Sequence, residues 1–281
     1  MPSRKTQLRF VPVGDTGNFT PSRQRPVRVR ARSLQADTHF KPHSHAWAQL
    51  AYCSTGVLQV TAEQARHAGG EITYIVPPSR AVWIAPGAQH HVTVLEAAEF
   101  RTLYIDAGAA PKGWSGCRVM VVSPLLRESI LALDEATPQQ PLPAAREQLL
   151  CNLVLDELAR ADTQALGVPM PHPQTGDKRL RTLCEAVLRA PSERATLAEW
   201  AADTGASERT VARLFRDELG LSYQQWRQQA ILAHALPMLT RGQSVSTVAA
   251  ASGYASDSAF TAMFKAAMGQ PPSHFQNKNR L

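Results

Sequence analysis

The chain has 281 residues, enough for two domains that each bury a core. Its composition is 44% hydrophobic, 19% charged and 6% aromatic, which excludes a disordered chain and a fibrous one. No apolar stretch approaches the roughly 20 residues of a membrane helix, and residues 1–6 lead into no apolar signal segment. We therefore expect a cytoplasmic protein without a membrane partner.

The formal net charge of +7 is unevenly distributed along the chain. Residues 1–41 hold nine Lys and Arg against two Asp and Glu, residues 42–176 hold eight against twelve, and residues 177–281 hold thirteen against nine. Basic flanks suit neutralisation of nucleic-acid phosphates, although a solvated surface gives the same excess. The cysteines form no C-x-x-C pair, so neither a thiolate zinc site nor a redox centre is predicted; they are Cys53, Cys117, Cys151 and Cys184.

In chain order, residues 1–26 predict an irregular basic tail. From residue 27 to 105, short β-rich runs broken by Gly and Pro indicate a β-sandwich or barrel. Two apolar stripes at helical spacing follow: Leu126, Ile130 and Leu133, then Leu149, Leu150, Leu153, Val154 and Leu158. The second stripe either packs on its own domain or forms a homodimer.

A proline-rich segment follows the second stripe. Three prolines and a glycine within residues 168–177 exclude a helix and a central strand. Residues 166–177 are therefore predicted to be a linker between one domain at 27–165 and another at 178–281.

The last hundred residues contain one unit twice. Residues 209–220 align with residues 258–269 at an offset of 49, and residues 197–205 align with 245–253 at an offset of 48. Each unit predicts an Ala-rich helix, a turn opened by Gly205 or Gly253, and a second helix begun by Ser207 or Ser256. This order is typical of a helix-turn-helix, here at about residues 196–217 and 244–267.

The second helix of each unit turns its apolar residues inward, which leaves a polar outer face. An arginine fork can bind guanine in the major groove, and hydroxyls can bind bases or phosphates. The candidate DNA contacts are Ser207, Arg209, Thr210, Ala212, Arg213 and Arg216 in the first unit, and Ser256, Ser258, Thr261, Ala262 and Lys265 in the second.

The segment between the two units, residues 222–240, is helical in propensity. At 1.5 Å per residue it would span nearly 30 Å, close to the roughly 34 Å between successive major-groove faces. One chain could therefore bind two adjacent grooves. Pro237 predicts a kink or an early stop in this helix.

Residues 253–265 and 269–275, together with the double motif, resemble the signature of the AraC/XylS family of transcription regulators. The resemblance covers about residues 178–276. It implies a bacterial regulator that binds double-stranded promoter DNA through both motifs and acts on RNA polymerase. It also places base contacts at Arg209, Ala212 and Arg213. An arginine that some members use in the second helix falls on Ala262, which suggests weaker direct readout by the second unit.

In the N-terminal half, His43, His45, Gln49 and Gly56 have the spacing H-x-H-x3-Q-x6-G. This resembles the first cupin motif, with Gln49 in the place of its glutamate. Residues 85–90, which end in His90, resemble the second motif imperfectly. The predicted fold is therefore α+β with two domains, a cupin-like N-terminal β-barrel with accessory helices and an all-α C-terminal domain with two helix-turn-helix units.

Three interpretations of the barrel remain open: a metal-bearing sensor, a metal-free pocket for a small-molecule effector, and a purely structural barrel. The candidate divalent metal ligands are His43, His45, Gln49 and His90, since histidines at i and i+2 on a strand share one face. The candidate effector pocket adds Trp47, Tyr52 and Trp83 to these four.

These patterns favour a sequence-specific transcription regulator, activator or repressor, that is not an enzyme and is controlled by an effector in the barrel. The competing hypothesis is a metal-dependent cupin enzyme with a helical DNA-binding appendage. The glutamine at position 49 and the complete double motif weigh against the enzyme.

Overall fold

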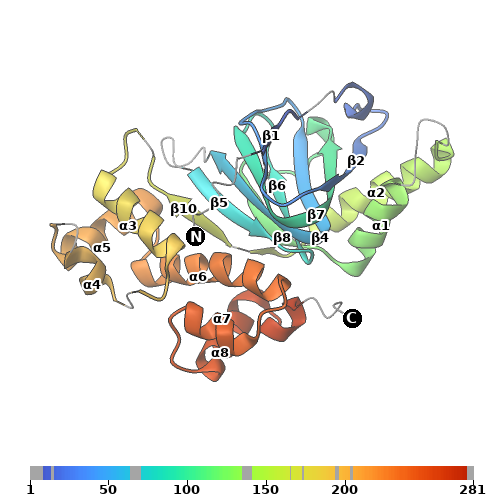
Figure 1. The fold of residues 1–281 in the computed structure, drawn as a ribbon. Helices are drawn as coiled ribbons and strands as arrows, with labels where there is room; N and C mark the ends of the chain where they lie inside the picture. Colours follow the sequence, from blue (N-terminus) through green and yellow to red (C-terminus); the bar gives the residue numbers. More distant parts are fainter. Residues whose placement is uncertain are drawn as a thin grey trace. The chain divides into compact units, whose positions relative to one another are not determined.

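The computed structural model describes residues 9–13, 16–63, 71–134, 141–164, 166–172, 174–193, 196–202 and 205–276. Contacts divide the chain into two compact units, Met1–Ala62 with Val76–Ala165, and Glu63–Ile75 with Leu166–Leu281. Figure 1 labels their helices and most of their strands. The predicted α+β fold class, an N-terminal β domain with helices followed by an all-helical double helix-turn-helix region, is confirmed.

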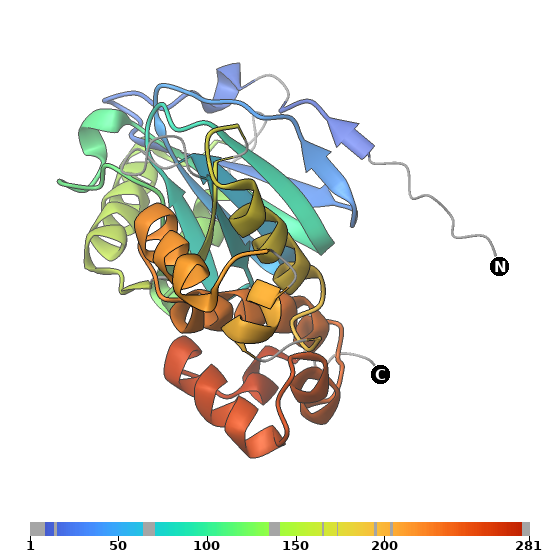
Figure 2. The ribbon, with the colours of Figure 1, turned by 90° about the vertical axis from the view of Figure 1, so that its left-hand side faces the viewer.

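The first unit is an antiparallel β-sheet with helices (Figure 2). Its strands run in the order β1-β3-β7-β4-β6-β8-β9, with β2 paired to β7. Only the pair β1 and β3 is parallel among the strand pairs described for this unit. The strands are β1 (Arg9–Val11), β2 (Val27–Leu34), β3 (Thr38–Phe40), β4 (Ala48–Glu63), β6 (Arg80–Ile84), β7 (His90–Ile105), β8 (Arg118–Val121) and β9 (Thr163–Gln164). Strand β1 lies within the segment predicted to be an irregular tail.

Strand β4 joins two of the β-rich runs that the sequence presents separately. Its pairing with β7 shifts register between Cys53 and Leu58, so the strand bends there instead of ending. Gly56 sits in this bend at φ +80°, and a Cβ atom there would lie 2.3 Å from the Ala97 carbonyl oxygen. Only glycine fits this close approach. The sequence therefore has a glycine inside a continuous strand, where it looks like a turn between two strands.

Helices α1 (Pro124–Asp134) and α2 (Ala144–Arg160) cover one face of this sheet. The buried face of α2, Cys151, Val154 and Leu158, packs against strand residues such as Leu50 and Leu103. The predicted apolar stripe therefore packs mainly on its own domain. Leu149, at the edge of the stripe, remains 70% exposed.

The second unit includes strand β10 (Gly167–Met170) and, apart from its last residue, strand β5 (Glu71–Val76), and the two strands pair antiparallel. Strand β10 occupies the start of the predicted linker. Its Val168 and Met170 belong to the buried cluster of the C-terminal helices, and the Trp226 indole Nε1 donates a hydrogen bond of 2.7 Å to the Pro169 carbonyl oxygen. Proline is compatible with a strand in this position because β10 has one described partner strand, β5, and lies at an edge where a missing N–H is tolerated.

The helices of the second unit are α3 (Lys178–Arg189), α4 (Leu197–Ala202), α5 (Glu208–Leu219), α6 (Tyr223–Thr240), α7 (Val245–Ala251) and α8 (Asp257–Met268), followed by the 3₁₀ turn η3 (Pro272–Phe275). Helix α6 contacts both α3 and α7, so it connects the two repeated units. It continues past Pro237 to Thr240, and the predicted early stop is wrong. Buried Leu239 and Thr240 anchor the last turn and offset the amide hydrogen bond that the proline removes. None of the helices in the described ranges is long and apolar enough to cross a membrane.

Candidate functional site

Helices α4 and α5 form the first helix-turn-helix, and α7 and α8 form the second. In both turns the predicted glycine adopts a left-handed conformation, Gly205 at φ +65° and Gly253 at φ +79°. The hydroxyls of Ser207 and Ser256 accept hydrogen bonds of 3.2 Å from the amides of Thr210 and Ala259, respectively. Both serines are therefore N-caps, and their side chains are engaged by their own helices.

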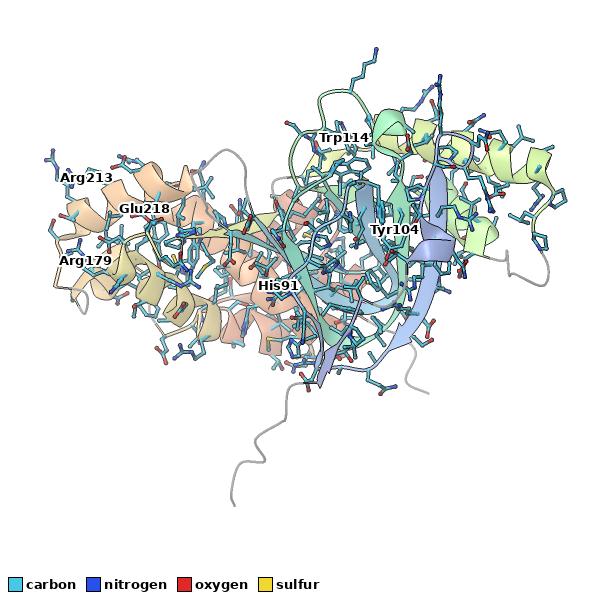
Figure 3. All side chains as sticks on the ribbon, turned by 90° about the horizontal axis from the view of Figure 1, so that it is seen from above. His91, Tyr104, Trp114, Arg179, Arg213 and Glu218 are labelled. Atoms are coloured by element: carbon cyan, nitrogen blue, oxygen red, sulfur yellow. The ribbon has the colours of Figure 1, made fainter. Side chains whose placement is uncertain are left out.

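The outer face of α5 is basic. Arg209, Arg213 and Arg216 are exposed there, whereas Thr210 and Ala212 are half-buried. Figure 3 shows Arg213 extending from α5. Its Nε lies 4.0 Å from the Asp217 carboxylate with 73% of the side chain exposed, a weak pairing that leaves the guanidinium available.

The outer face of α8 is nearly neutral by comparison. Ser258, Ala262 and Lys265 are exposed and Thr261 is half-buried. Its inner face, Phe260, Phe264 and Met268, is buried. The structure thus places the predicted contacts of each unit along one helix face, with Ser207 and Ser256 at the helix starts.

In the first unit, His43, His45 and His90 form a cluster whose candidate ligand atoms all lie within 4.8 Å of one another. The backbones of His43 and His90 exchange two hydrogen bonds of 3.0 Å, which brings the ends of two segments together. The Nδ1 atom of each ring lies 2.8 to 2.9 Å from a backbone carbonyl oxygen, that of Lys41, Trp47 or Ala88. A carbonyl can only accept, so in neutral rings Nδ1 carries the hydrogen and Nε2 presents a lone pair.

The environment favours neutral rings at two of these histidines. Burial lowers the pKa of His43, and burial also lowers the pKa of His90 to about 3. The Nε2 atom of His90 is buried and has no hydrogen-bond partner. An unpartnered buried acceptor is costly, and a cation bound by the three Nε2 atoms would satisfy it. Hydrogen bonds from Nδ1 to carbonyls are the support that orients histidine ligands in metal sites.

Gln49 and Trp47 complete the surroundings of His45. The His45 Nε2 atom lies 2.7 Å from the Gln49 side-chain oxygen, and the His45 ring stacks on Trp47 with a centroid distance of 5.3 Å. When the His45 ring is neutral with its hydrogen on Nδ1, two acceptors at this separation require either a shared cation or an amide turned so that its NH₂ group donates. Gln49 is thus positioned beside the histidine cluster as predicted from the motif spacing.

Tyr52 and Trp83, which the sequence analysis assigned to the same pocket, lie elsewhere. Both are fully buried in the cluster formed with α1 and α2, on the sheet face opposite Gln49. Strand parity explains the error, because Gln49 and Tyr52 are three residues apart on a continuous strand and must point to opposite faces. These two residues are removed from the candidate pocket.

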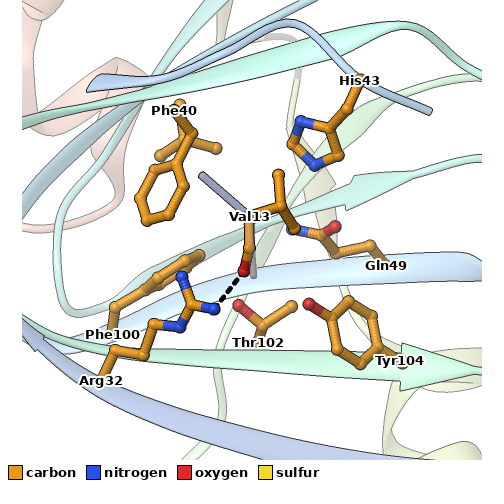
Figure 4. A pocket seen from close by; sticks show the side chains of 9 residues that line it. Val13, Arg32, Phe40, His43, Gln49, Phe100, Thr102 and Tyr104 are labelled. Atoms are coloured by element: carbon orange, nitrogen blue, oxygen red, sulfur yellow. Dashed lines mark hydrogen bonds between the residues drawn. The ribbon is translucent and has the colours of Figure 1, made fainter. Parts of the chain in front are cut away.

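A small cavity, partly open to solvent, adjoins the histidine cluster and is lined by His43 and Gln49. Figure 4 shows Phe40 and Phe100 on one side of it, with His43, Gln49 and Tyr104 on the other. Arg32, Thr102 and Tyr104 were not singled out from the sequence. The alternation of Arg28, Arg30 and Arg32 with apolar or small residues was the signal that could have indicated a charged face on β2.

Comparisons with known proteins find a family model that matches each half of the chain. Residues 26–163 match the model of the AraC-like ligand binding domain, and residues 200–278 match a helix-turn-helix domain. The chain is 37% identical over 235 residues to the HTH-type transcriptional regulator NimR of Escherichia coli K12, covering 83% of this chain and 81% of NimR. The chain belongs to the AraC family. It is thus an AraC-type helix-turn-helix transcription regulator with a ligand-binding domain.

Two further similarities are more distant. The HTH-type transcriptional regulator RipA of Corynebacterium glutamicum is 32% identical over 108 residues, which cover 38% of this chain and 32% of RipA. A structure of ToxT from Vibrio cholerae is 9% identical with a TM-score of 0.36, over 89% of this chain and 97% of ToxT.

Membership of the AraC family also decides between the two functional hypotheses, because it makes this chain a transcription regulator and not a cupin enzyme.

Proposed function

We propose that this AraC-family protein is a sequence-specific regulator that binds promoter DNA through α5 and α8 and is controlled by an effector in its N-terminal unit. The observation that carries the proposal is the exposed arginine row of α5, Arg209, Arg213 and Arg216, on a capped helix whose opposite face is buried. Such a helix presents bidentate donors to a major groove. The regulator acts in the cytoplasm and activates or represses according to where it stands relative to RNA polymerase.

The two helices have different roles in this proposal. Arg209 and Arg213 read base edges with Ala212 between them, while Arg216 and Lys265 contact phosphates. Helix α8 contributes Ser258, Thr261 and Ala262, which make few charged contacts, so the second unit depends more on DNA shape. Ser207 and Ser256 cap the first turns of α5 and α8, and in this proposal the free amides of these turns face the DNA phosphates.

Genome-wide mapping of bound sites, followed by mobility-shift assays on the recovered fragments, tests this function. We expect a few promoter fragments to be retained over competitor DNA at physiological salt. Equal binding to all fragments, with and without added metal ions and small molecules, would contradict sequence-specific regulation.

The N-terminal unit binds a divalent metal in this proposal. His43, His45 and His90 supply Nε2 ligands and Gln49 supplies a carbonyl oxygen, supported by the three Nδ1–carbonyl hydrogen bonds and the unpartnered Nε2 of His90. The ion would fix the three rings beside the cavity, which His43 lines. Elemental analysis of purified protein should give near-stoichiometric metal.

Histidine variants test which residues bind the metal. The double variant His43→Ala and His45→Ala should lose the metal and keep promoter binding, whereas His91→Ala, the matched control on β7, should retain both. Metal content that is unchanged in the double variant would remove the histidines from the ligand set.

A homodimer formed through α2 is the remaining part of the proposal. Leu149 is 70% exposed on α2 and Leu125 is 50% exposed on α1, and large exposed apolar side chains favour association. Sedimentation of Leu149→Glu should show a smaller species than the parent protein, with Asn152→Glu as the exposed control on the same helix. Identical sedimentation of all three proteins would exclude α2 as the contact.

A further inference from the structure

Two guanidinium groups, that of the cavity residue Arg32 and that of Arg30 on the same strand, converge on one oxygen atom. The Arg30 Nη1 atom donates a hydrogen bond of 3.1 Å to the Val13 carbonyl oxygen. Arg32 Nη2 donates to the same oxygen, and Figure 4 shows this second contact. Both arginines project to the cavity side of β2, since Arg30 pairs in register with Thr102 and Arg32 with Phe100, two residues that line the cavity. Two forks aimed at one point are the arrangement that binds an oxyanion, and a neutral carbonyl is a weak partner for them.

Within the part of the chain that the structure describes, the positive charge of Arg30 and Arg32 has no acidic partner. Arg28, the preceding arginine on this face, is bonded to the Glu147 carboxylate at 2.8 Å. Among the described residues, no carboxylate pairs with Arg30 or Arg32, and none of the described residues that line the cavity is acidic. Burial first, and then the positive charge of Arg30, lower the pKa of Arg32. An anion between the two side chains would relieve this repulsion.

The walls of the cavity define the rest of a ligand. Phe40 and Phe100 form an apolar wall, and the Arg32 guanidinium lies 5.5 Å from the centroid of the Phe40 ring, a contact that holds the fork in place. Thr102 and Tyr104 add hydroxyl groups. The space left between these side chains is small and Val13 also lines it, so a ligand must be small and must displace Val13 to bind here.

We propose that Arg30 and Arg32 bind the carboxylate of the effector, and that the effector is a small monocarboxylate whose apolar body packs on Phe40 and Phe100. The carboxylate takes the place of the Val13 carbonyl as the acceptor of both arginines. The unused donors of the Arg32 fork allow the two-point contact that arginine makes with carboxylates. This inference rests on the proposed function, because it takes the cavity as the effector site.

The test compares phenylacetate with phenylacetamide, which has nearly the same shape and no charge. Thermal unfolding and calorimetric titration of the full chain are measured at about 10 mM probe, which saturates a site with a Kd of about 1 mM. A ligand that binds only the folded protein raises its Tm. We expect phenylacetate to raise Tm and phenylacetamide to leave it unchanged.

Variants assign the effect to the arginines. Arg32→Gln should weaken phenylacetate binding by about tenfold or more, because it removes charge-assisted hydrogen bonds. Arg32→Lys keeps the charge and should bind with intermediate affinity, which also covers the case in which the Gln variant does not fold. Arg160→Gln, an exposed charge of the same unit on α2, is the matched control and should bind like the parent.

Three results would overturn the inference: equal binding of phenylacetate and phenylacetamide, unchanged binding in both Arg32 variants, or no Tm shift with acetate, hexanoate or phenylacetate. Stabilisation by inorganic phosphate but by none of these carboxylates would also overturn it. Promoter binding of the ligand-free parent, measured in parallel, separates the two proposals. Retained promoter binding without any carboxylate effect removes only the ligand class, while absent promoter binding removes the regulator itself.

Discussion

The two helix-turn-helix units are alike inside and different outside. Val211, Phe215 and Leu219 on α5 are buried like Phe260, Phe264 and Met268 on α8, and both helices begin at a capping serine and end at a left-handed glycine. Their outer faces carry three arginines in one case and a single lysine in the other. The repeat therefore preserves what folds the unit, while the surface that would meet DNA has diverged between the copies.

Removal of a buried phenylalanine from each unit tests whether the two helix-turn-helix cores contribute equally to stability. Phe215→Ala and Phe264→Ala each remove a fully buried ring, so each should lower the free energy of unfolding by about 3–5 kcal/mol in urea denaturation. Lys265→Ala, an exposed position on α8, is the control and should change stability little. A loss under about 1 kcal/mol at only one phenylalanine would show that the two cores are not equivalent.

The next effect tests the difference between the surfaces. Arg213 and Ala262 occupy the same place in the two repeats, because their numbers differ by the offset of 49. Arg213→Ala should weaken promoter binding by about 1–3 kcal/mol and relax the preference at one base, measured by mobility shift on the native site and single-base variants. Arg160→Ala on α2 should leave both quantities unchanged.

The substitution Ala262→Arg gives α8 the arginine that α5 has at the equivalent position. Ala262→Arg should strengthen binding to general DNA at low salt, because it adds a phosphate-binding charge to the neutral face. Unchanged binding in both Arg213→Ala and Ala262→Arg would mean that this helix position does not approach DNA in either unit.

The smallest expected effect concerns the helix starts. Ser207→Ala and Ser256→Ala each remove one hydrogen bond of 3.2 Å to a helix amide, and each should lower stability by about 1 kcal/mol. Asn at either position keeps an acceptor and should restore most of the loss. If Ala and Asn behave alike at one serine, that residue does not cap its helix in solution.

The sequence predicted the C-terminal half well because its signals are local. Turn glycines, capping serines and apolar periodicity lie within a few residues of each other, and the structure has each of them where the repeat placed it. Of the kink or early stop predicted at Pro237, the early stop is wrong, because the burial of Leu239 and Thr240 outweighs the local rule for stopping helices.

The N-terminal half was harder because its site is assembled from distant segments. His43, His45 and Gln49 could be found by spacing, but Arg32, Phe100 and Tyr104 meet only through the pairing of β2, β4 and β7. No local pattern encodes that register. The position of Tyr52, in contrast, was predictable from the sequence. Tyr52 lies three residues after Gln49 on β4, so the alternation of side chains along a strand places it on the opposite face.

The hydrogen bond from Trp226 to Pro169 bears on how this regulator can be divided. A fragment that starts at Lys178 would lack β10, leaving the indole N–H of a fully buried tryptophan without its acceptor, at a penalty of about 1–3 kcal/mol, and baring the apolar surface that Val168 and Met170 cover. Chimaeras that transplant the DNA-binding half onto a different sensor should accordingly be spliced upstream of Gly167, so that the strand travels with its tryptophan.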